Sequence, residues 1–307
     1  MKDFAPMNDI PEQSAERMLG VLLVALSAAV FGLAGVLTKS IAADPLVITC
    51  WRGLFGGIFI GIYVLWRRSR NGASLALGWQ GWLLALIGAT ASIAFIAAFK
   101  AGIVANVAII YATVPFAAAL FARFLFGERF RRQTMLAALA SLAGVAVMVS
   151  VGIGGGSVRG DALALVMMML SALYMVLVRR FRATPAVWAA AVSAFLLFGF
   201  GWLAADPLAV SARDMALCVA FGLSFAFAVI LWTEGARLIP APEAGLIGSA
   251  EVPFAIIFAW LILAEQPPLA SVAGGAIVLA AVFAHGYLDW RRGRSGAKQA
   301  PAVREPA

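Results

Sequence analysis

Glu251 is the residue of this 307-residue sequence whose type and position most directly suggest chemistry. It lies near the middle of a long apolar stretch and two residues before Pro253. Proline lacks an N–H, so it leaves a backbone carbonyl without its helical donor. A carboxyl group deep in an apolar segment is costly and is therefore a candidate for function. We expect Glu251 to exchange a proton or to pair with a substrate ammonium group. The structural alternative is a carboxyl that only holds two helices together.

Arg52 is a second ionisable residue inside an apolar stretch. A guanidinium group binds a carboxylate through two parallel hydrogen bonds. Phe55, Phe59 and Tyr63 follow at helical spacing, so they share one stripe of a helix with Arg52. We expect Arg52 and Phe59 to contact a substrate. The alternative is a guanidinium that reaches the membrane interface or caps carbonyl groups of another helix.

A smaller set of polar and aromatic residues completes the candidate substrate site. Asn106 and Thr113 are seven residues apart and share a helix face, with Tyr111 nearby. Phe254 follows Glu251 at helical spacing, on a stripe that is otherwise apolar. Such a wall suits an amphipathic solute with one polar group. Hydrogen bonds to neighbouring helices explain Asn106 and Thr113 equally well.

Motifs for other chemistries are missing from the sequence. The single histidine cannot form a His-rich metal site, and the two cysteines do not have CxxC spacing. A phosphate-binding GxxxxGK[ST] loop and the GxSxG motif of hydrolases are both absent. We therefore expect no metal, no cofactor and no enzyme activity. An intramembrane enzyme and a non-transporting assembly protein remain as poor alternatives.

The composition indicates which elements must position these residues. The chain is 63% hydrophobic and only 12% charged, with a mean hydropathy of +0.96, whereas a soluble domain contains about 25% charged residues. A water-soluble protein of this length cannot bury so much apolar chain, so the excess must face lipid. This excludes a soluble enzyme, a DNA-binding domain and a secreted disulfide scaffold.

A membrane-spanning helix needs about 20 mostly apolar residues, because its backbone polar groups must bond to one another in lipid. We predict an all-α integral membrane protein with ten transmembrane helices. They cover residues 19–38, 46–66, 79–99, 103–126, 133–152, 161–178, 185–204, 214–236, 241–263 and 269–289.

The basic residues predict the orientation. With ten crossings, 17 of the 23 Lys and Arg residues fall on one side of the membrane and four on the other. Cytoplasmic loops are enriched in Lys and Arg. We therefore expect the N-terminal segment 1–17 and the basic tail 291–307 to be cytoplasmic, in a plasma (bacterial inner) membrane. The net charge of +8 is then a topology signal, and no nucleic-acid partner is expected.

The two halves of the chain resemble each other. Val-Pro-Phe-Ala occurs at 114–117 and again at 252–255, an offset of 138 residues, and a glutamate follows each motif, at Glu128 and Glu265. We predict two five-helix repeats, 18–152 and 153–290. Five is odd, so the second repeat enters the membrane from the opposite face. Inverted repeats are typical of secondary transporters, whose substrate site lies between the halves.

With these repeat motifs and this charge distribution, the sequence resembles the drug/metabolite transporter superfamily, and within it the EamA-type transporters. The resemblance covers residues 18–290 and implies ten helices around a central cavity, in a monomer or homodimer. It also implies export of amino acids or related amphipathic solutes by alternating access, with protons as a candidate coupling ion. Import of a vitamin or nucleoside-like metabolite is the alternative.

The topology can be tested with a reporter that is active only outside the cytoplasm. A fusion to Ala307 is expected to give no signal, because the basic tail should stay in the cytoplasm. A fusion near Asp206 is expected to be active. The reverse pattern would contradict the ten-helix topology.

Overall fold

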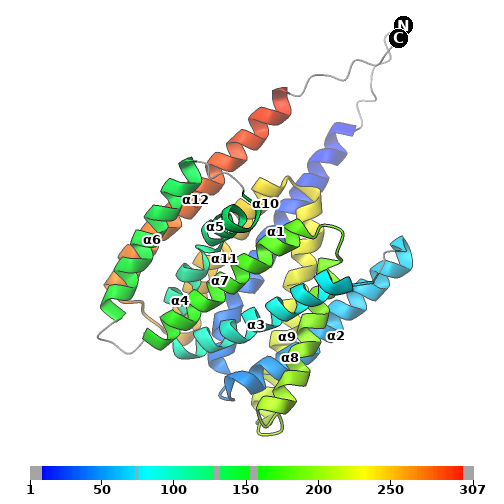
Figure 1. Ribbon diagram of the computed structural model, residues 1–307, viewed down its shortest axis with the longest axis vertical. Helices are drawn as coiled ribbons and strands as arrows, with labels where there is room; N and C mark the ends of the chain where they lie inside the picture. Colours follow the sequence, from blue (N-terminus) through cyan, green and yellow to red (C-terminus); the bar gives the residue numbers. More distant parts are fainter. Residues whose placement is uncertain (1–8, 73–74, 128–131, 153–157, 300–307) are drawn as a thin grey trace.

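The computed structural model describes residues 9–72, 75–127, 132–152 and 158–299, which form twelve α-helices and no strand (Figure 1). The helices of the first half are α1 (Asp9–Ser40), α2 (Pro45–Asn71), α3 (Gly78–Ala101), α4 (Val104–Tyr111), α5 (Val114–Phe126) and α6 (Arg132–Gly152). Those of the second half are α7 (Val158–Arg180), α8 (Ala186–Ala204), α9 (Ala212–Leu238), α10 (Ala241–Gly248), α11 (Glu251–Leu263) and α12 (Leu269–Gln299).

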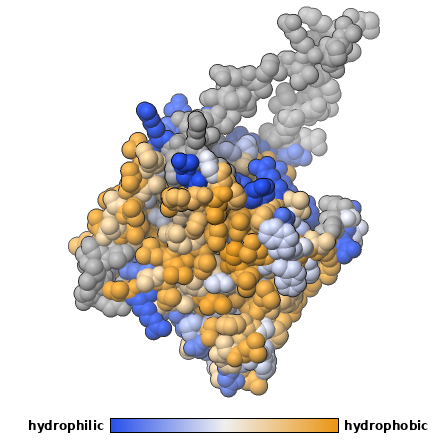
Figure 2. Space-filling view, viewed as in Figure 1, coloured by the Kyte–Doolittle hydropathy of each residue, from blue (hydrophilic) through white to orange (hydrophobic). Residues whose placement is uncertain are grey.

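These helices confirm the predicted membrane architecture. Within the described residues, nine segments are long and apolar enough to cross a membrane; α4 with α5, and α10 with α11, each make one of them. α6 is the remaining helix of the ten that were predicted, and its apolar stretch, Arg132–Met148, is shorter than the other nine. Figure 2 shows a broad apolar surface over the middle of the visible face, with hydrophilic residues toward its ends. The chain is therefore a multi-pass, all-α membrane protein.

Two of the ten spanning segments are interrupted near their middle. α4 ends at Tyr111 and α5 begins at Val114, and α10 ends at Gly248 and α11 begins at Glu251. Pro115 and Pro253 cause the breaks, because neither can donate a helical hydrogen bond. At both breaks a side-chain hydroxyl donates to a backbone carbonyl of the preceding turn. Thr113 Oγ1 donates to the Ile110 carbonyl at 2.7 Å, and Ser249 Oγ donates to the Leu246 carbonyl at 2.6 Å.

The main helix pairs recur when the two halves are exchanged. α1 packs on α9, and its counterpart α7 packs on α3. α1 also contacts α11, and α7 contacts α4 and α5. α2 packs on α8 and α6 packs on α12, so in these two pairs a helix contacts its own counterpart in the other half. Figure 1 shows α6 and α12 side by side, and the start of α1 and the end of α12 at the same end of the bundle.

Glycines allow the paired helices to approach closely. A Cβ atom on Gly235 of α9 would lie 3.0 Å from the carbonyl oxygen of Gly20 in α1. At the counterpart crossing of α3 and α7, a Cβ atom on Gly102 would lie 3.2 Å from the Cα of Gly160. Close backbone contact through small residues is the usual way in which helices associate in lipid.

Ion pairs join the helices at both ends of the bundle. Lys39 of α1 lies 3.2 Å from the carboxylate of Glu265, which also accepts a hydrogen bond from the backbone N–H of Val104 at 2.9 Å. At the opposite end, Arg17 pairs with Glu243 at 2.7 Å. Glu128, the predicted repeat counterpart of Glu265, lies outside the described residues.

The crossing of α6 and α12 gives a test of this packing. A Cβ atom on Gly144 would lie 2.6 Å from the carbonyl oxygen of Gly274, so Gly144→Ala must push the two backbones apart. Overpacking of this kind costs about 1–3 kcal/mol, and we expect a lower apparent melting temperature in detergent. Gly199→Ala is the matched control, because a Cβ atom there has no neighbour within 4 Å. Equal effects of the two substitutions would contradict the observed α6–α12 contact.

Candidate functional site

Glu251 is the first residue of α11, directly after the break in the spanning segment Ala241–Leu263. The N-terminus of a helix carries a partial positive charge, which stabilises a carboxylate. Glu251 is half-buried, and its backbone packs close to Gly32 of α1. Within the described part of the chain, its carboxyl group forms no hydrogen bond or ion pair. The carboxyl therefore remains available for a proton or a ligand.

Tyr111 links Glu251 to the first half of the chain. It is the last residue of α4 and directly precedes the break between α4 and α5. α4 packs against α11, the helix that begins at Glu251. The Tyr111 ring meets Phe95 of α3 edge-on, with ring centroids 6.4 Å apart. These contacts place the two helix breaks next to each other, with α3 beside them.

Arg52 is buried in α2, with only 6% of its surface exposed. Its Nη1 donates a hydrogen bond to Ser92 Oγ of α3 at 2.6 Å. Its Cζ lies 4.9 Å from the ring centroid of Phe221 and 4.3 Å from that of Phe225, both on α9. The guanidinium is thus held by one hydroxyl and two aromatic rings, and cation–π attraction partly replaces its lost hydration.

The Arg52 guanidinium retains unused hydrogen-bonding capacity. Its Nε is buried without an acceptor, and among the described residues no carboxylate lies within salt-bridge distance. A buried charge without a counter-ion is strongly destabilising. An anion that bound beside Arg52 would supply the missing charge and the missing acceptor.

The side chains around Arg52 and Glu251 meet on one face of α3. Ser92, which bonds Arg52, lies one helical turn before Phe95, which contacts Tyr111. Phe95 also packs against two buried clusters, one containing Phe221 and the other containing residues of α11. Side chains of α3 therefore contact both the surroundings of Arg52 and the helix that begins at Glu251.

Asn106 and Thr113 do not join this arrangement. Asn106 Nδ2 donates to Asp161 Oδ1 of α7 at 3.3 Å, and both residues are buried. The Thr113 hydroxyl donates to the Ile110 carbonyl. Because the helix is interrupted between Tyr111 and Val114, Asn106 and Thr113 do not lie on one continuous helix face, as the sequence had predicted. The Thr113 hydroxyl and the Asn106 Nδ2 are thus bonded within the fold, whereas Asn106 Oδ1 has no hydrogen-bond partner among the described residues.

The two predicted aromatic residues pack in different places. Phe59 lies against a buried cluster of Ile60 and Ala226, which Phe225 also contacts, so it is a neighbour of the Arg52 surroundings. Phe254 stacks on Phe258 with ring centroids 5.9 Å apart, and its Cβ packs against Gly32.

Ser92, Phe221 and Phe225 form the surroundings of Arg52 and were not predicted from the sequence. A polar Ser92 in the apolar α3 and the four-residue spacing of Phe221 and Phe225 are the only sequence signals for them. Neither signal indicates which helix faces Arg52, since serines and phenylalanines at helical spacing are common in any apolar bundle.

The fold is similar to that of a solved structure whose title reads only "Crystal structure of protein". The TM-score is 0.61 and the identity 22%, and the match covers 89% of this chain and 98% of that chain. At this identity the likeness concerns the fold alone. No curated protein matches the chain.

The model of the EamA-like transporter family matches the sequence twice, at residues 18–150 and 158–286. The two matches cover most of the chain, and each contains one of the interrupted helices described above. The inverted pair of five-helix units seen in the packing is therefore also present in the family assignment. The chain belongs to the EamA-like transporter family.

Proposed function

We propose that this protein is a secondary transporter of small organic solutes that carry a carboxylate, with amino acids or related amphipathic metabolites exported by alternating access. The observation that carries the proposal is Arg52, a buried guanidinium with an unbonded Nε and no carboxylate partner among the described residues. A substrate carboxylate supplies the missing acceptor and the missing negative charge, through two parallel hydrogen bonds. The rings of Phe221 and Phe225 make the surroundings of the charge apolar, which suits a substrate with an apolar body.

Glu251 is the second ionisable group of the proposed substrate site. It lies at mid-segment beside a helix break, which is where transporters place ion and substrate sites. Either a proton or a substrate ammonium group neutralises its carboxyl. A zwitterionic amino acid offers a carboxylate that Arg52 can bind and an ammonium group that Glu251 can bind. Because Ser92, Phe95 and Tyr111 separate the two residues, one α-amino acid would meet them in turn during transport and not together.

The breaks at Thr113 and Ala250 supply the movable elements. Rocking of one half against the other would expose the path between Arg52 and Glu251 to each side of the membrane in turn. The termini lie in the cytoplasm, and the protein resides in the plasma (bacterial inner) membrane. The family is one of transporters, so at that level transport rather than catalysis is the activity.

The direct test is counterflow into proteoliposomes that contain the purified full chain. A panel of amino acids and their carboxamides is offered, and uptake of each labelled compound is measured against unlabelled compound inside. Amino acids are expected to exchange, and the amides, which lack the carboxylate, to exchange at least tenfold more slowly. Equal exchange of acids and amides would exclude a carboxylate site.

Arg52→Lys keeps the positive charge but loses the planar fork of the guanidinium. A hydrogen bond to a charged group contributes about 1.5–3 kcal/mol. We therefore expect the half-saturating concentration of the carboxylate substrate to rise by about tenfold or more, with a smaller change for its amide. Ser92→Ala, which removes only the hydroxyl bonded to Arg52, should have a weaker effect. Wild-type transport by Arg52→Lys would show that Arg52 does not bind a carboxylate.

Glu251→Gln preserves size and hydrogen bonding but cannot titrate. If Glu251 couples protons, the variant is expected to bind and exchange substrate while its net transport loses its dependence on a pH gradient. If Glu251 pairs with the substrate ammonium, binding itself weakens. Binding and pH-gradient-driven flux are measured on the same preparation. Normal transport at every pH would make Glu251 a structural residue.

A further inference from the structure

Glu265, shortly after the end of α11, joins two other elements at the end of the bundle opposite the termini (Figure 1). Its carboxylate lies 3.2 Å from Lys39 Nζ in the last turn of α1 and accepts the N–H of Val104, the first residue of α4, at 2.9 Å. The Glu265 side chain is only 16% exposed. Lys39 and Val104 belong to the first half of the chain and Glu265 to the second, so one carboxylate ties the two halves together.

The chain reaches Glu265 through a strained residue. Ala264 has a φ of 51° and a ψ of 27°, and in the part of the chain that the structure describes it is the only residue other than glycine with a positive φ. The counterpart position, after α5, is Gly127, which adopts the same left-handed conformation without a Cβ atom. Alanine is unfavourable in this conformation and persists only where neighbouring contacts impose it. Glu265 supplies such contacts through Lys39 and Val104.

A second carboxylate holds the loop between α1 and α2, residues 41–44, at the same end. Asp214 Oδ1, in the first turn of α9, accepts the Ala42 N–H at 3.1 Å. Lys100 Nζ, in the last turn of α3, donates to the Ile41 carbonyl at 2.5 Å. Two carboxylates of the second half, those of Glu265 and Asp214, therefore fix the end of α1 and the loop that follows it.

An apolar cluster lies beneath this loop. Its buried members come from the loop, α2, α3 and α9 and are Ile41, Ile48, Ile96, Cys218 and Phe221. None of them is more than 1% exposed. The Phe221 ring also contacts the Arg52 guanidinium, at 4.9 Å from its Cζ. The cluster thus lies between the loop and Arg52, and it closes the way to Arg52 from this end.

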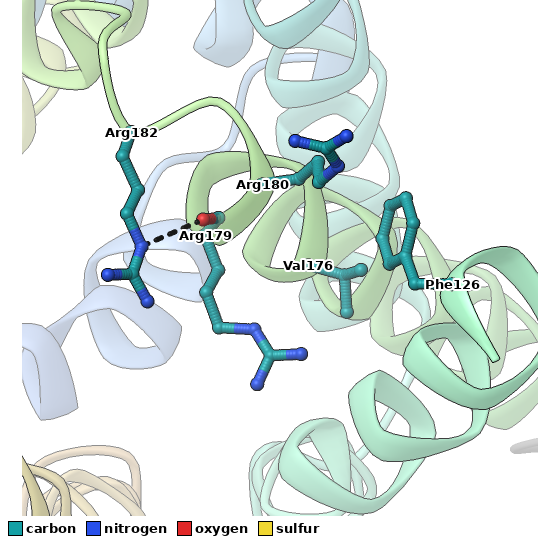
Figure 3. A pocket seen from close by; sticks show the side chains of 5 residues that line it. All are labelled: Phe126, Val176, Arg179, Arg180 and Arg182. Carbon is teal, nitrogen blue, oxygen red and sulfur yellow. Dashed lines mark hydrogen bonds between the residues drawn. The ribbon is translucent and has the colours of Figure 1, made fainter. Parts of the chain in front are cut away.

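The other half has the same arrangement of helix ends. Arg180 is the last residue of α7, and Lys39 lies in the last turn of α1, the counterpart helix. Figure 3 shows the end of α7 next to Phe126 at the end of α5, and the Arg180 Cζ lies 5.8 Å from the Phe126 ring centroid. Glu128, the sequence counterpart of Glu265, lies outside the described residues. In both halves a basic residue thus ends one helix beside the exit of an interrupted helix, where a glutamate follows in the sequence.

We propose that Glu265 is the latch that holds this end of the bundle closed. In the alternating access of the proposed function, on which this role rests, the two halves must separate at each end in turn. At this end, separation breaks the two contacts of Glu265. The loop 41–44 then leaves the apolar cluster and opens the way to Arg52. Release also lets Ala264 leave the left-handed region, which partly offsets the lost ion pair.

Cys218 gives a direct measure of opening, because it is fully buried in the apolar cluster. Cys50 is the only other cysteine of the chain, so Cys50→Ala leaves a single thiol. The full chain in lipid nanodiscs, which expose both faces, is treated with a sulfonated methanethiosulfonate reagent, and the mass gained at Cys218 is followed over time. The apparent melting temperature is recorded on the same samples. No substrate is present, so the result does not depend on the proposed carboxylate site.

Glu265→Gln removes the charge that pairs with Lys39 but keeps a hydrogen-bond acceptor. We expect this substitution to speed the modification of Cys218 about tenfold, because it shifts the open–closed equilibrium by roughly one charge-assisted contact. Glu265→Ala, which removes both contacts, should speed the modification further. Glu243→Gln is the matched control, since it breaks the ion pair with Arg17 at the opposite end of the bundle and should leave the rate unchanged.

Lys39→Gln breaks the same ion pair from its other side and reports on the latch if the Glu265 variants fail to fold. It is expected to speed the modification of Cys218 as Glu265→Gln does. Equal acceleration by Glu243→Gln would overturn the proposal, because the bundle would then be loosened as a whole. A wild-type rate in the Glu265 and Lys39 variants would also overturn it. If the melting temperature falls while that rate stays unchanged, Glu265 only supports the fold.

Discussion

Backbone hydrogen bonding in lipid is the constraint on which this structure depends. Each spanning segment must be helical, because an unpaired backbone N–H or C=O in the hydrocarbon region costs several kcal/mol. Interruptions are therefore possible only where protein surrounds them. Pro115 and Pro253 create two such interruptions. Around them, α4 and α5 pack on α7, α10 and α11 pack on α1, and α4 also contacts α3 and α11. The hydroxyls of Thr113 and Ser249 bond carbonyls in the preceding turn. The breaks bring polar atoms into the middle of an otherwise apolar protein, and Glu251 lies at one of them.

The pseudo-two-fold packing positions the helices that carry the site. α1 against α9 and α3 against α7 are equivalent crossings, and each contains a glycine–glycine approach. Two of these four helices, α3 and α9, supply Ser92, Phe95, Phe221 and Phe225, which surround or approach Arg52. The sequence departs from the symmetry where chemistry is expected: the position equivalent to Glu251 is Thr113. Similar packing in the two halves can thus allow symmetric motion, while at this position only the second half carries a carboxyl group.

The charged groups described below form ion pairs at the ends of the bundle but not in its middle. At the ends, Lys39 with Glu265 and Arg17 with Glu243 are paired, and these contacts join α1 to the segments that follow α11 and begin α10. In the middle, Arg52 and Glu251 have no ionic partner among the described residues. Unpaired charge is far more costly within a membrane than at its surface. Retaining it there is reasonable when a ligand or a proton completes the pair, which is the physical basis of the proposed transport of carboxylate solutes.

Local composition and spacing were enough to predict the architecture: ten apolar segments, their division into two inverted halves and the two prolines that interrupt symmetric helices. The same patterns predicted Arg52 and Glu251 as candidate site residues, because an ionisable residue in an apolar segment is conspicuous without any knowledge of its neighbours. The partners of these residues could be decided only by tertiary structure. Ser92 is forty residues from Arg52, and Asp161 is 55 residues from Asn106. Helical periodicity shows which residues share a face, but it contains no information on which two faces meet. That choice depends on the fit of side chains and glycines across each crossing, and it assigned Asn106 to the fold and the aromatic surroundings to Arg52.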